Sequence, residues 1–148
     1  MNWKDYLDYS KLPTIFCPGC GIGIGLRAIL QSLSDLNIKK EDVIFVSGIG
    51  CSSRIPGYLD LDSLHTLHGR AIPFATGVKL SYPEKNVIVI TGDGDGLSIG
   101  GNHMIHAARR NISIKTFLFN NMTYGMTGGQ ASPTTPLNKI TSTTPYGK

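Results

Sequence analysis

The sequence contains too few cysteines for a secreted domain held together by disulfides, since only three occur among its 148 residues. No apolar run approaches the roughly 18 residues that a membrane-spanning helix needs. The opening residues lack the basic and then apolar profile of a secretory signal. The 14 Lys and Arg exceed the 10 Asp and Glu only slightly and form no basic stripe, so neither nucleic acid nor a membrane is indicated as a partner. We therefore expect a cytoplasmic protein.

Glycine is in excess, with 18 of 148 residues, and it gathers in a few short segments. Ordinary usage is roughly 7%. The segments between the glycine clusters have apolar residues at regular spacing. The apolar positions predict helices over residues 22–33, 69–82 and 99–110, and strands over 43–46, 86–91 and 112–119. This alternation predicts an α/β fold with a mainly parallel sheet flanked by helices, in which the loops after the strands share one edge.

Polar residues follow two of the predicted strands directly. Gly92-Asp93-Gly94-Asp95 comes after one strand and Asn120-Asn121 after the next, and residues 95–119 between them suit one crossover helix. If the strands are neighbours, Asp93 and the Asn pair lie side by side at the ligand-binding edge. An acidic turn repels a bare phosphate, so this arrangement favours a bridging Mg²⁺, which prefers carboxylate, amide and carbonyl oxygens. For an isolated motif, a tight turn with an Asp helix cap would be the better interpretation.

Two nucleotide-binding motifs are absent. Neither Gly21-x-Gly23 nor Gly92-x-Gly94 completes Gly-x-Gly-x-x-Gly/Ala, and there is no Walker loop.

The cysteines also indicate metal chemistry. Cys17 and Cys20 form a Cys-x-x-Cys pair, and Cys51 lies in the loop after the first predicted strand, at the same sheet edge as Asp93. Taken alone, the pair favours a structural zinc site, with His65 or His68 as further ligands. A thioredoxin-like dithiol is disfavoured because no strand is predicted before Cys17.

Several motifs, taken together, resemble a known family. Gly92-Asp-Gly with Asn120-Asn121 is similar to the thiamine diphosphate motif. The wider set resembles the β subunit of 2-oxoacid:ferredoxin oxidoreductases, and its blocks are Cys17-Pro-Gly-Cys20, Gly48-Ile-Gly-Cys51-Ser-Ser-Arg54, His65-Thr-Leu-His68-Gly-Arg70-Ala and Tyr124-Gly-Met-Thr-Gly-Gly-Gln130-Ala-Ser-Pro-Thr. The blocks run from residue 17 to about residue 135, almost the whole chain.

The resemblance implies a set of ligands. Mg²⁺ would be held by Asp93, Asn121 and the carbonyl of Thr123, and a [4Fe-4S] cluster by Cys17, Cys20 and Cys51. The thiamine diphosphate pocket would be lined by Ile49, Gly50, Cys51, Ser52, His68, Gly69, Arg70, Ala71, Gly94, Asp95, Gly125 and Met126. The implied reaction is CoA-dependent oxidative decarboxylation of a 2-oxoacid, favouring 2-oxoglutarate, to acyl-CoA, CO₂ and reduced ferredoxin. Arg54 is a candidate for binding a substrate carboxylate, with a solvated surface arginine as the equal alternative.

Two requirements of that chemistry are not met by these residues. A [4Fe-4S] cluster needs four thiolate ligands, and this sequence has three cysteines. The resemblance places the fourth cysteine in a C-terminal half beyond Lys148. The only glutamates, Glu41 and Glu84, precede strands at the opposite sheet edge. The resemblance implies that the catalytic glutamate comes from the pyrimidine-binding domain of a partner α subunit, in a hetero-oligomer that is inactive without it.

We therefore expect residues 1–148 to be the N-terminal portion of a thiamine diphosphate-binding domain, with 122–148 as a cofactor flap or a truncated tail. Two alternatives stay open. One is a non-redox thiamine diphosphate-dependent decarboxylase half, and the other is a non-enzymatic metal-binding or electron-transfer module.

Overall fold

A four-stranded, wholly parallel sheet in the order β2-β1-β3-β4 forms the centre of the computed structural model, which describes residues 2–148. The strands are β1 (Val43–Ser47), β2 (Ser63–His65), β3 (Asn86–Gly92) and β4 (Lys115–Phe119). The helices are α1 (Ile22–Asp35), α2 (Ala71–Ser81) and α3 (Gly101–Arg109). Short helical turns are η1 (Trp3–Tyr6), η2 (Tyr9–Lys11), η3 (Lys40–Asp42), η4 (Ser52–Tyr58) and the π-helical η5 (Gly94–Ile99). A small antiparallel pair, β5 (Thr123–Tyr124) and β6 (Gln130–Ala131), follows β4.

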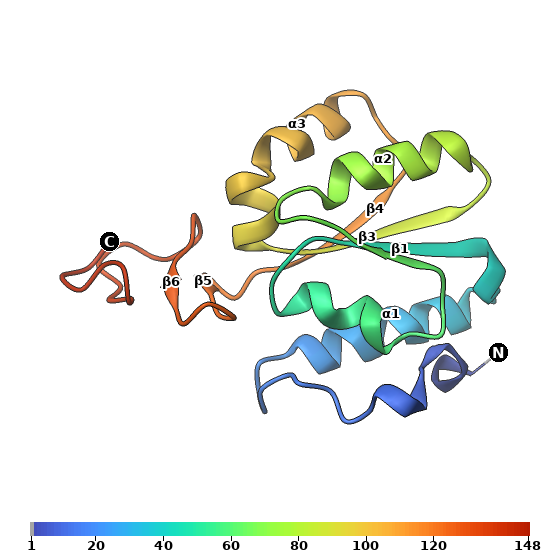
Figure 1. Cartoon of the computed structure of the whole chain (residues 1–148), viewed down its shortest axis with the longest axis horizontal. Coiled ribbons are helices and arrows are strands. Elements are labelled where there is room, and N and C mark those ends of the chain that lie inside the picture. The colour runs from blue at the N-terminus through green and yellow to red at the C-terminus, as the bar shows by residue number, and fades with distance from the viewer. Residues whose placement is uncertain (1) are drawn as a thin grey trace.

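Helices cover both faces of the sheet, with α1 and the N-terminal turns on one face and α2 and α3 on the other (Figure 1). Strands β1 and β3 are buried on both faces because their alternate side chains enter two separate cores. The first core contains Phe45 and Ile90 with the apolar stripe of α1, and the second contains Val46 and Val89 packed against α2. The predicted α/β class and the mainly parallel sheet are confirmed.

The register of the sheet positions the polar loops. Gly92 of β3 pairs with Phe119 of β4, so Asp93 and Asn120 are the first residues beyond paired positions on neighbouring strands. The two turns therefore leave the sheet side by side, as the alternating pattern predicted.

Three local predictions differ from the structure. Residues 92–96 do not form a separate turn, because the π-helical η5 begins at Gly94 and leads into α3. The last predicted strand is shorter, since residues 112–114 are irregular after the turn that ends α3 and pairing starts only at Lys115. Strand β2 was not predicted, because its three residues are all exposed and show no apolar pattern.

None of the helices in residues 2–148 combines the length and apolar character that crossing a bilayer requires. Beyond β6 the chain extends away from the sheet, as the red segment of Figure 1 shows. Residues 122–148 contain little regular structure apart from the β5-β6 pair, as their composition predicted.

Candidate functional site

A cavity of about 430 Å³ opens at the carboxyl ends of the parallel strands. This volume lies within the range of small-molecule sites, and the carboxyl edge of such a sheet is where ligands bind. Its walls come from the loops after β1, β2, β3 and β4, the start of α1 and the β5 turn. The lining residues are Cys20, Gly21, Ile22, Ile49, Gly50, Cys51, Ser52, His68, Gly92, Asp93, Gly94, Asp95, Phe119, Asn120, Asn121, Thr123, Tyr124, Gly125, Met126 and Thr127.

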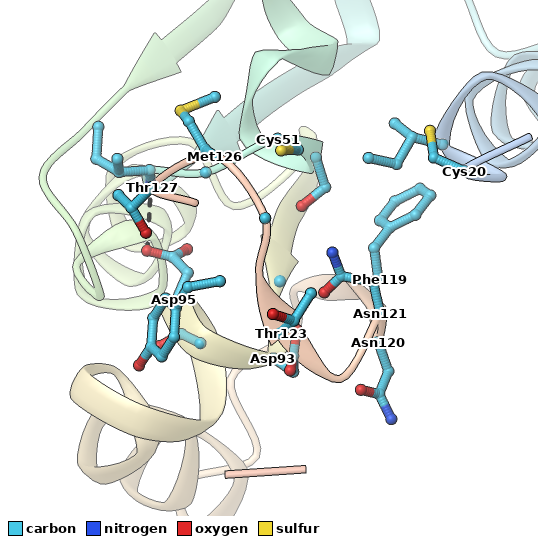
Figure 2. Close-up of a pocket in the computed structure, with 18 of the residues that line it drawn as sticks. Cys20, Cys51, Asp93, Asp95, Phe119, Asn120, Asn121, Thr123, Met126 and Thr127 are labelled. Carbon is cyan, nitrogen blue, oxygen red and sulfur yellow. Dashed lines mark hydrogen bonds between the residues drawn. The ribbon is translucent and has the colours of Figure 1, made fainter. Parts of the chain in front are cut away.

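Three oxygen-bearing groups converge on one side of this cavity, from Asp93, Asn121 and Thr123 (Figure 2). One terminal atom of the Asn121 amide lies 2.8 Å from the Thr123 carbonyl oxygen and 2.9 Å from Asp93 Oδ1. If that atom is nitrogen, the amide donates a hydrogen bond to both. If it is oxygen, three acceptors face one another with no proton between them, and a cation is needed to hold them together.

The spacing of these atoms is that of N–H···O hydrogen bonds and also that of neighbouring ligands around Mg²⁺. Adjacent oxygens in an Mg²⁺ octahedron with bonds of 2.0–2.1 Å are about 2.8–3.0 Å apart. The separations of 2.8 and 2.9 Å in this group agree with that geometry. Asp93 is also almost completely buried, so a counter-charge would lower the cost of keeping its carboxylate there. The residues present therefore fit the ion.

A second carboxylate, Asp95, ties three loops together beneath the cavity. Its Oδ1 accepts hydrogen bonds from the backbone N–H groups of Ile49 at 3.2 Å and Gly69 at 2.6 Å, and from His68 Nδ1 at 2.9 Å. Its Oδ2 accepts from the Thr91 hydroxyl at 2.5 Å. Because a carboxylate only accepts, Nδ1 of His68 carries the proton in this pair. Asp95 thereby fixes the positions of the loops after β1, β2 and β3 relative to one another.

Two glycines allow this close packing. A β-carbon at Gly48 would overlap the Asp95 carboxylate, and one at Gly94 would overlap the ring of Tyr124. Tyr124 in turn donates to the Gly94 carbonyl at 3.4 Å and lies 6.2 Å, between ring centroids, from His68. At these two positions of the cavity wall, a side chain would prevent the close approach of backbone and neighbouring side chains, so glycine is required.

Cys51 lies beside the converging oxygens. A β-carbon at Gly125 would lie 3.4 Å from the Asn121 amide nitrogen and 3.6 Å from Cys51 Sγ. Cys20 lines the cavity just before α1 (Figure 2). Cys17 is exposed and does not line it. Burial raises the pKa of the Cys51 thiol, and the nearby Cys17 and Cys20 add smaller contributions in the same direction.

The cysteines do not form a closed ligand set. Among residues 2–148, no three His, Cys, Asp or Glu side chains are gathered closely enough to hold a metal ion. The zinc alternative, with His65 or His68 as ligands, also lacks a gathered set of ligands. His68 Nδ1 is hydrogen-bonded to Asp95, and His65 Nδ1 lies 3.0 Å from the Ser47 hydroxyl. The iron–sulfur ligands stay a prediction.

Four other predicted residues lie outside the cavity lining. Gly69 reaches it through its N–H bond to Asp95, whereas Ala71 is buried in the core at the start of α2. The Arg70 guanidinium donates to the carbonyls of Gly69 and Ile99, and Arg54 is exposed on η4. The remaining pocket residues that were predicted all line the cavity.

Glu41 and Glu84 lie before β1 and β3, at the sheet edge away from the cavity, as expected.

Sequence reasoning missed two residues that shape the site. Neither Phe119 nor Thr134 was assigned a role in the site, although Thr134 ends the last motif block. Phe119 ends β4 and lines the cavity, and its apolar type was absorbed into the strand pattern. Thr134 lies in the last predicted block, and its hydroxyl donates to Asp93 Oδ2 at 2.7 Å. Only the motif Gln130-Ala-Ser-Pro-Thr134 signalled it, and that motif carried no assigned contact.

Comparison with known proteins identifies a family for the chain. The family model described as "Thiamine pyrophosphate enzyme, C-terminal TPP binding domain" matches residues 48–148. The 2-oxoglutarate synthase subunit KorB of Methanocaldococcus jannaschii is 60% identical over 142 residues, which make up 96% of this chain and 53% of that protein. The 2-oxoglutarate oxidoreductase subunit KorB of Mycobacterium tuberculosis is 52% identical over 144 residues, covering 97% of this chain and 38% of that protein.

A solved structure is similar throughout. The 2-oxoglutarate:ferredoxin oxidoreductase from Magnetococcus marinus, with 2-oxoglutarate, coenzyme A and succinyl-CoA bound, has a TM-score of 0.95 and 46% sequence identity. The match covers 99% of this chain and 50% of that chain. The chain spans about half the length of the first curated relatives that it matches.

The resemblance to 2-oxoacid:ferredoxin oxidoreductase β subunits is therefore confirmed by the relatives and by the fold. Since the family model also covers more than half of the sequence, the chain belongs to the thiamine pyrophosphate enzymes, within their C-terminal TPP-binding domain.

Proposed function

We propose that this chain forms the thiamine diphosphate and Mg²⁺ site of the β subunit of a 2-oxoglutarate:ferredoxin oxidoreductase. The reaction would be CoA-dependent oxidative decarboxylation of 2-oxoglutarate to acyl-CoA, CO₂ and reduced ferredoxin. The observation that carries the proposal is the convergence of Asp93, Asn121 and the Thr123 carbonyl at the cavity, with the Asn121 amide 2.8 and 2.9 Å from the other two groups. The names of the relatives support the choice of 2-oxoglutarate.

In this proposal Asp93, Asn121 and the Thr123 carbonyl would hold Mg²⁺, which would neutralise charge on the diphosphate. Thiamine diphosphate, when bound, supplies the nucleophilic carbon and the electron sink that decarboxylation of a 2-oxoacid requires. The wall formed by Ile49, Cys51 and Met126 would contact the organic part of the cofactor. His68 is held by Asp95 through Nδ1, which leaves Nε2 as its free ring nitrogen for a polar contact.

Cys17, Cys20 and Cys51 are the proposed cluster ligands, supported by the placement of two of them at the cavity that holds Asp93. A [4Fe-4S] cluster there would accept single electrons close to the cofactor. Because the described residues do not gather the three sulfurs, we derive no electron-transfer step through them. Free, unpaired cysteines suit a reducing cytoplasmic compartment, which is part of the proposal.

The proposal includes a partner α subunit that supplies the glutamate for cofactor activation. The chain's two glutamates, Glu41 and Glu84, both lie at the sheet edge away from the cavity. Arg54 is proposed to bind the distal carboxylate of 2-oxoglutarate, and its exposure on η4, two residues beyond Ser52 of the cavity wall, is compatible with a ligand or subunit lying over it.

The test uses the complete protein that carries this chain, purified without oxygen together with any copurifying subunit. We expect reduction of added ferredoxin that requires both 2-oxoglutarate and CoA. Asp93→Asn is expected to abolish Mg²⁺-dependent binding of thiamine diphosphate, measured by calorimetry, whereas Asp62→Asn in an exposed loop serves as the matched control. Protein that binds no thiamine diphosphate would refute the proposal. Iron-free protein that decarboxylates without reducing ferredoxin would favour the non-redox alternative.

A further inference from the structure

The Asp93 carboxylate is held from two sides. Oδ1 faces the Asn121 amide at 2.9 Å, within the proposed magnesium site. Oδ2 accepts a hydrogen bond from the Thr134 hydroxyl at 2.7 Å. Asp93 is about 1% exposed, so its carboxylate depends mainly on protein donors such as this hydroxyl. The hydroxyl therefore fixes the rotation of the carboxylate that presents Oδ1 to the cavity.

The same hydroxyl also reaches the neighbouring turn. Thr134 Oγ1 lies 2.8 Å from Asn120 Oδ1, and Asn120 Oδ1 accepts from the Met122 N–H at 3.2 Å. Asp93 follows β3 and Asn120 follows β4, so a single side chain bridges the two turns that carry the three oxygen groups. Its one proton is shared between two acceptors, which keeps both turns at a fixed separation.

The segment around Thr134 is anchored independently of Asp93. Thr135 donates from its hydroxyl to the Met122 carbonyl at 2.6 Å and accepts from the Ser132 N–H at 2.8 Å. Both Ser132 and Thr135 are buried. Met122 lies between Asn121 and Thr123, so this second contact braces the backbone of the other two oxygen groups.

The side chain of Lys148 also stabilises residues 132–135. The Lys148 ammonium donates to the carbonyls of Ser132 at 2.8 Å, Pro133 at 3.0 Å and Thr135 at 3.1 Å. These three carbonyls surround Thr134 in sequence. The turn that presents the Thr134 hydroxyl is therefore held by charge-assisted bonds as well as by its own hydroxyl groups.

We infer that Thr134 is a positioning residue for the divalent cation and that residues 132–135 form a brace that sets the geometry of its ligands. This inference rests on the proposed function, because it assigns a role toward the proposed Mg²⁺. Outer-shell partners of metal ligands typically change metal affinity by 10–100-fold when they are removed. Thr134→Val keeps the shape of the side chain and removes the hydroxyl, so it isolates that effect.

The experiment measures Mn²⁺ binding by electron paramagnetic resonance, in the complete protein with its copurifying subunit and saturating thiamine diphosphate. We expect Thr134→Val to raise the Mn²⁺ dissociation constant about 10–100-fold. Thr134→Ser keeps the hydroxyl and its hydrogen bond and loses only a methyl contact. Its Mn²⁺ dissociation constant is therefore expected to stay within about threefold of the value for the parent protein. Thr144→Val is the matched control, because the Thr144 hydroxyl donates to the Lys139 carbonyl and lies 2.7 Å from the Thr141 hydroxyl, outside residues 132–135.

A merely structural role predicts a different pattern. Thr134→Val would then lower the melting temperature equally with and without Mn²⁺, whereas a positioning role reduces the rise in melting temperature that the ion produces. Thr134→Ala gives the same comparison if the valine variant does not fold. Unchanged Mn²⁺ affinity in the valine or alanine variant, or equal weakening in the serine variant, would overturn the inference while the proposed function stands. Failure of the parent protein to bind Mn²⁺ with thiamine diphosphate would overturn both.

Discussion

Replacing Asp95 by Asn tests whether this carboxylate holds the cavity loops together. The Asn side chain has the same shape, so its oxygen can keep the three N–H donors of Ile49, His68 and Gly69, and its amide can donate to the Thr91 hydroxyl. What is lost is the negative charge. Hydrogen bonds to charged groups contribute about 1 kcal/mol more than neutral ones, so three such bonds predict a loss of about 3 kcal/mol in the free energy of unfolding.

The measurement is urea denaturation of the purified protein, with Asp60→Asn as the matched control. Asp60 pairs with Lys40 at 2.6 Å, but its side chain is 67% exposed. A surface pair of this kind contributes about 0–1 kcal/mol. Equal unfolding free energies for the two variants would refute the assigned role of Asp95, since the buried carboxylate would then contribute no more than an exposed one.

Three further predictions concern Gly94 in the cavity wall, the Cys51 thiol and the buried Tyr6. Gly94→Ala is expected to lower the unfolding free energy by about 1–3 kcal/mol, because the new methyl group overlaps the Tyr124 ring, and Tyr124→Leu in the same chain should recover part of the loss in urea denaturation. Burial raises the pKa of the Cys51 thiol, so at pH 8 in cluster-free protein Cys51 should be alkylated by iodoacetamide more slowly than the other two cysteines, as followed by peptide mass spectrometry; equal rates would contradict this. The Tyr6 hydroxyl is buried and donates to the Ile38 carbonyl at 2.5 Å, and burial raises its pKa above the ordinary value of 10.0. The folded state therefore favours the neutral phenol. The contribution of Tyr6 to the stability of the fold is complete below pH 10 and declines as the pH rises through the pKa of the folded state. Tyr6→Phe should therefore lessen the fall in melting temperature at alkaline pH.

The sheet and the meeting of the two polar turns could be predicted from the sequence for a simple reason. Parallel strands joined by single crossover helices must end at one edge, so residues directly after two neighbouring strands are brought together whatever the helices contain. Asp93 and Asn121 are such residues, and their register follows from the pairing of Gly92 with Phe119. The apolar stripe of α1 was equally informative, because Leu26 and Leu30 are buried where the spacing placed them.

The remaining features depend on contacts between segments with no shared periodic pattern. Asp95 was predicted only as a pocket residue, because no sequence signal shows that its carboxylate accepts bonds from loops 46 and 26 residues away. Thr134 was missed because it reaches Asp93 across 41 residues of chain from a segment with no apolar period. Strand β2 was missed because a three-residue exposed strand is specified by backbone pairing with β1 rather than by its side chains.

Strand β4 lies at the margin of the sheet, and its outer row of amide and carbonyl groups has no strand beside it among residues 2–148. Phe117 is 40% exposed there, next to the exposed Lys115 and Thr116. Such a margin is a template for adding another extended chain. If these residues are produced by themselves, we expect concentration-dependent self-association in light scattering, and Phe117→Lys should suppress it by placing charge along the open margin.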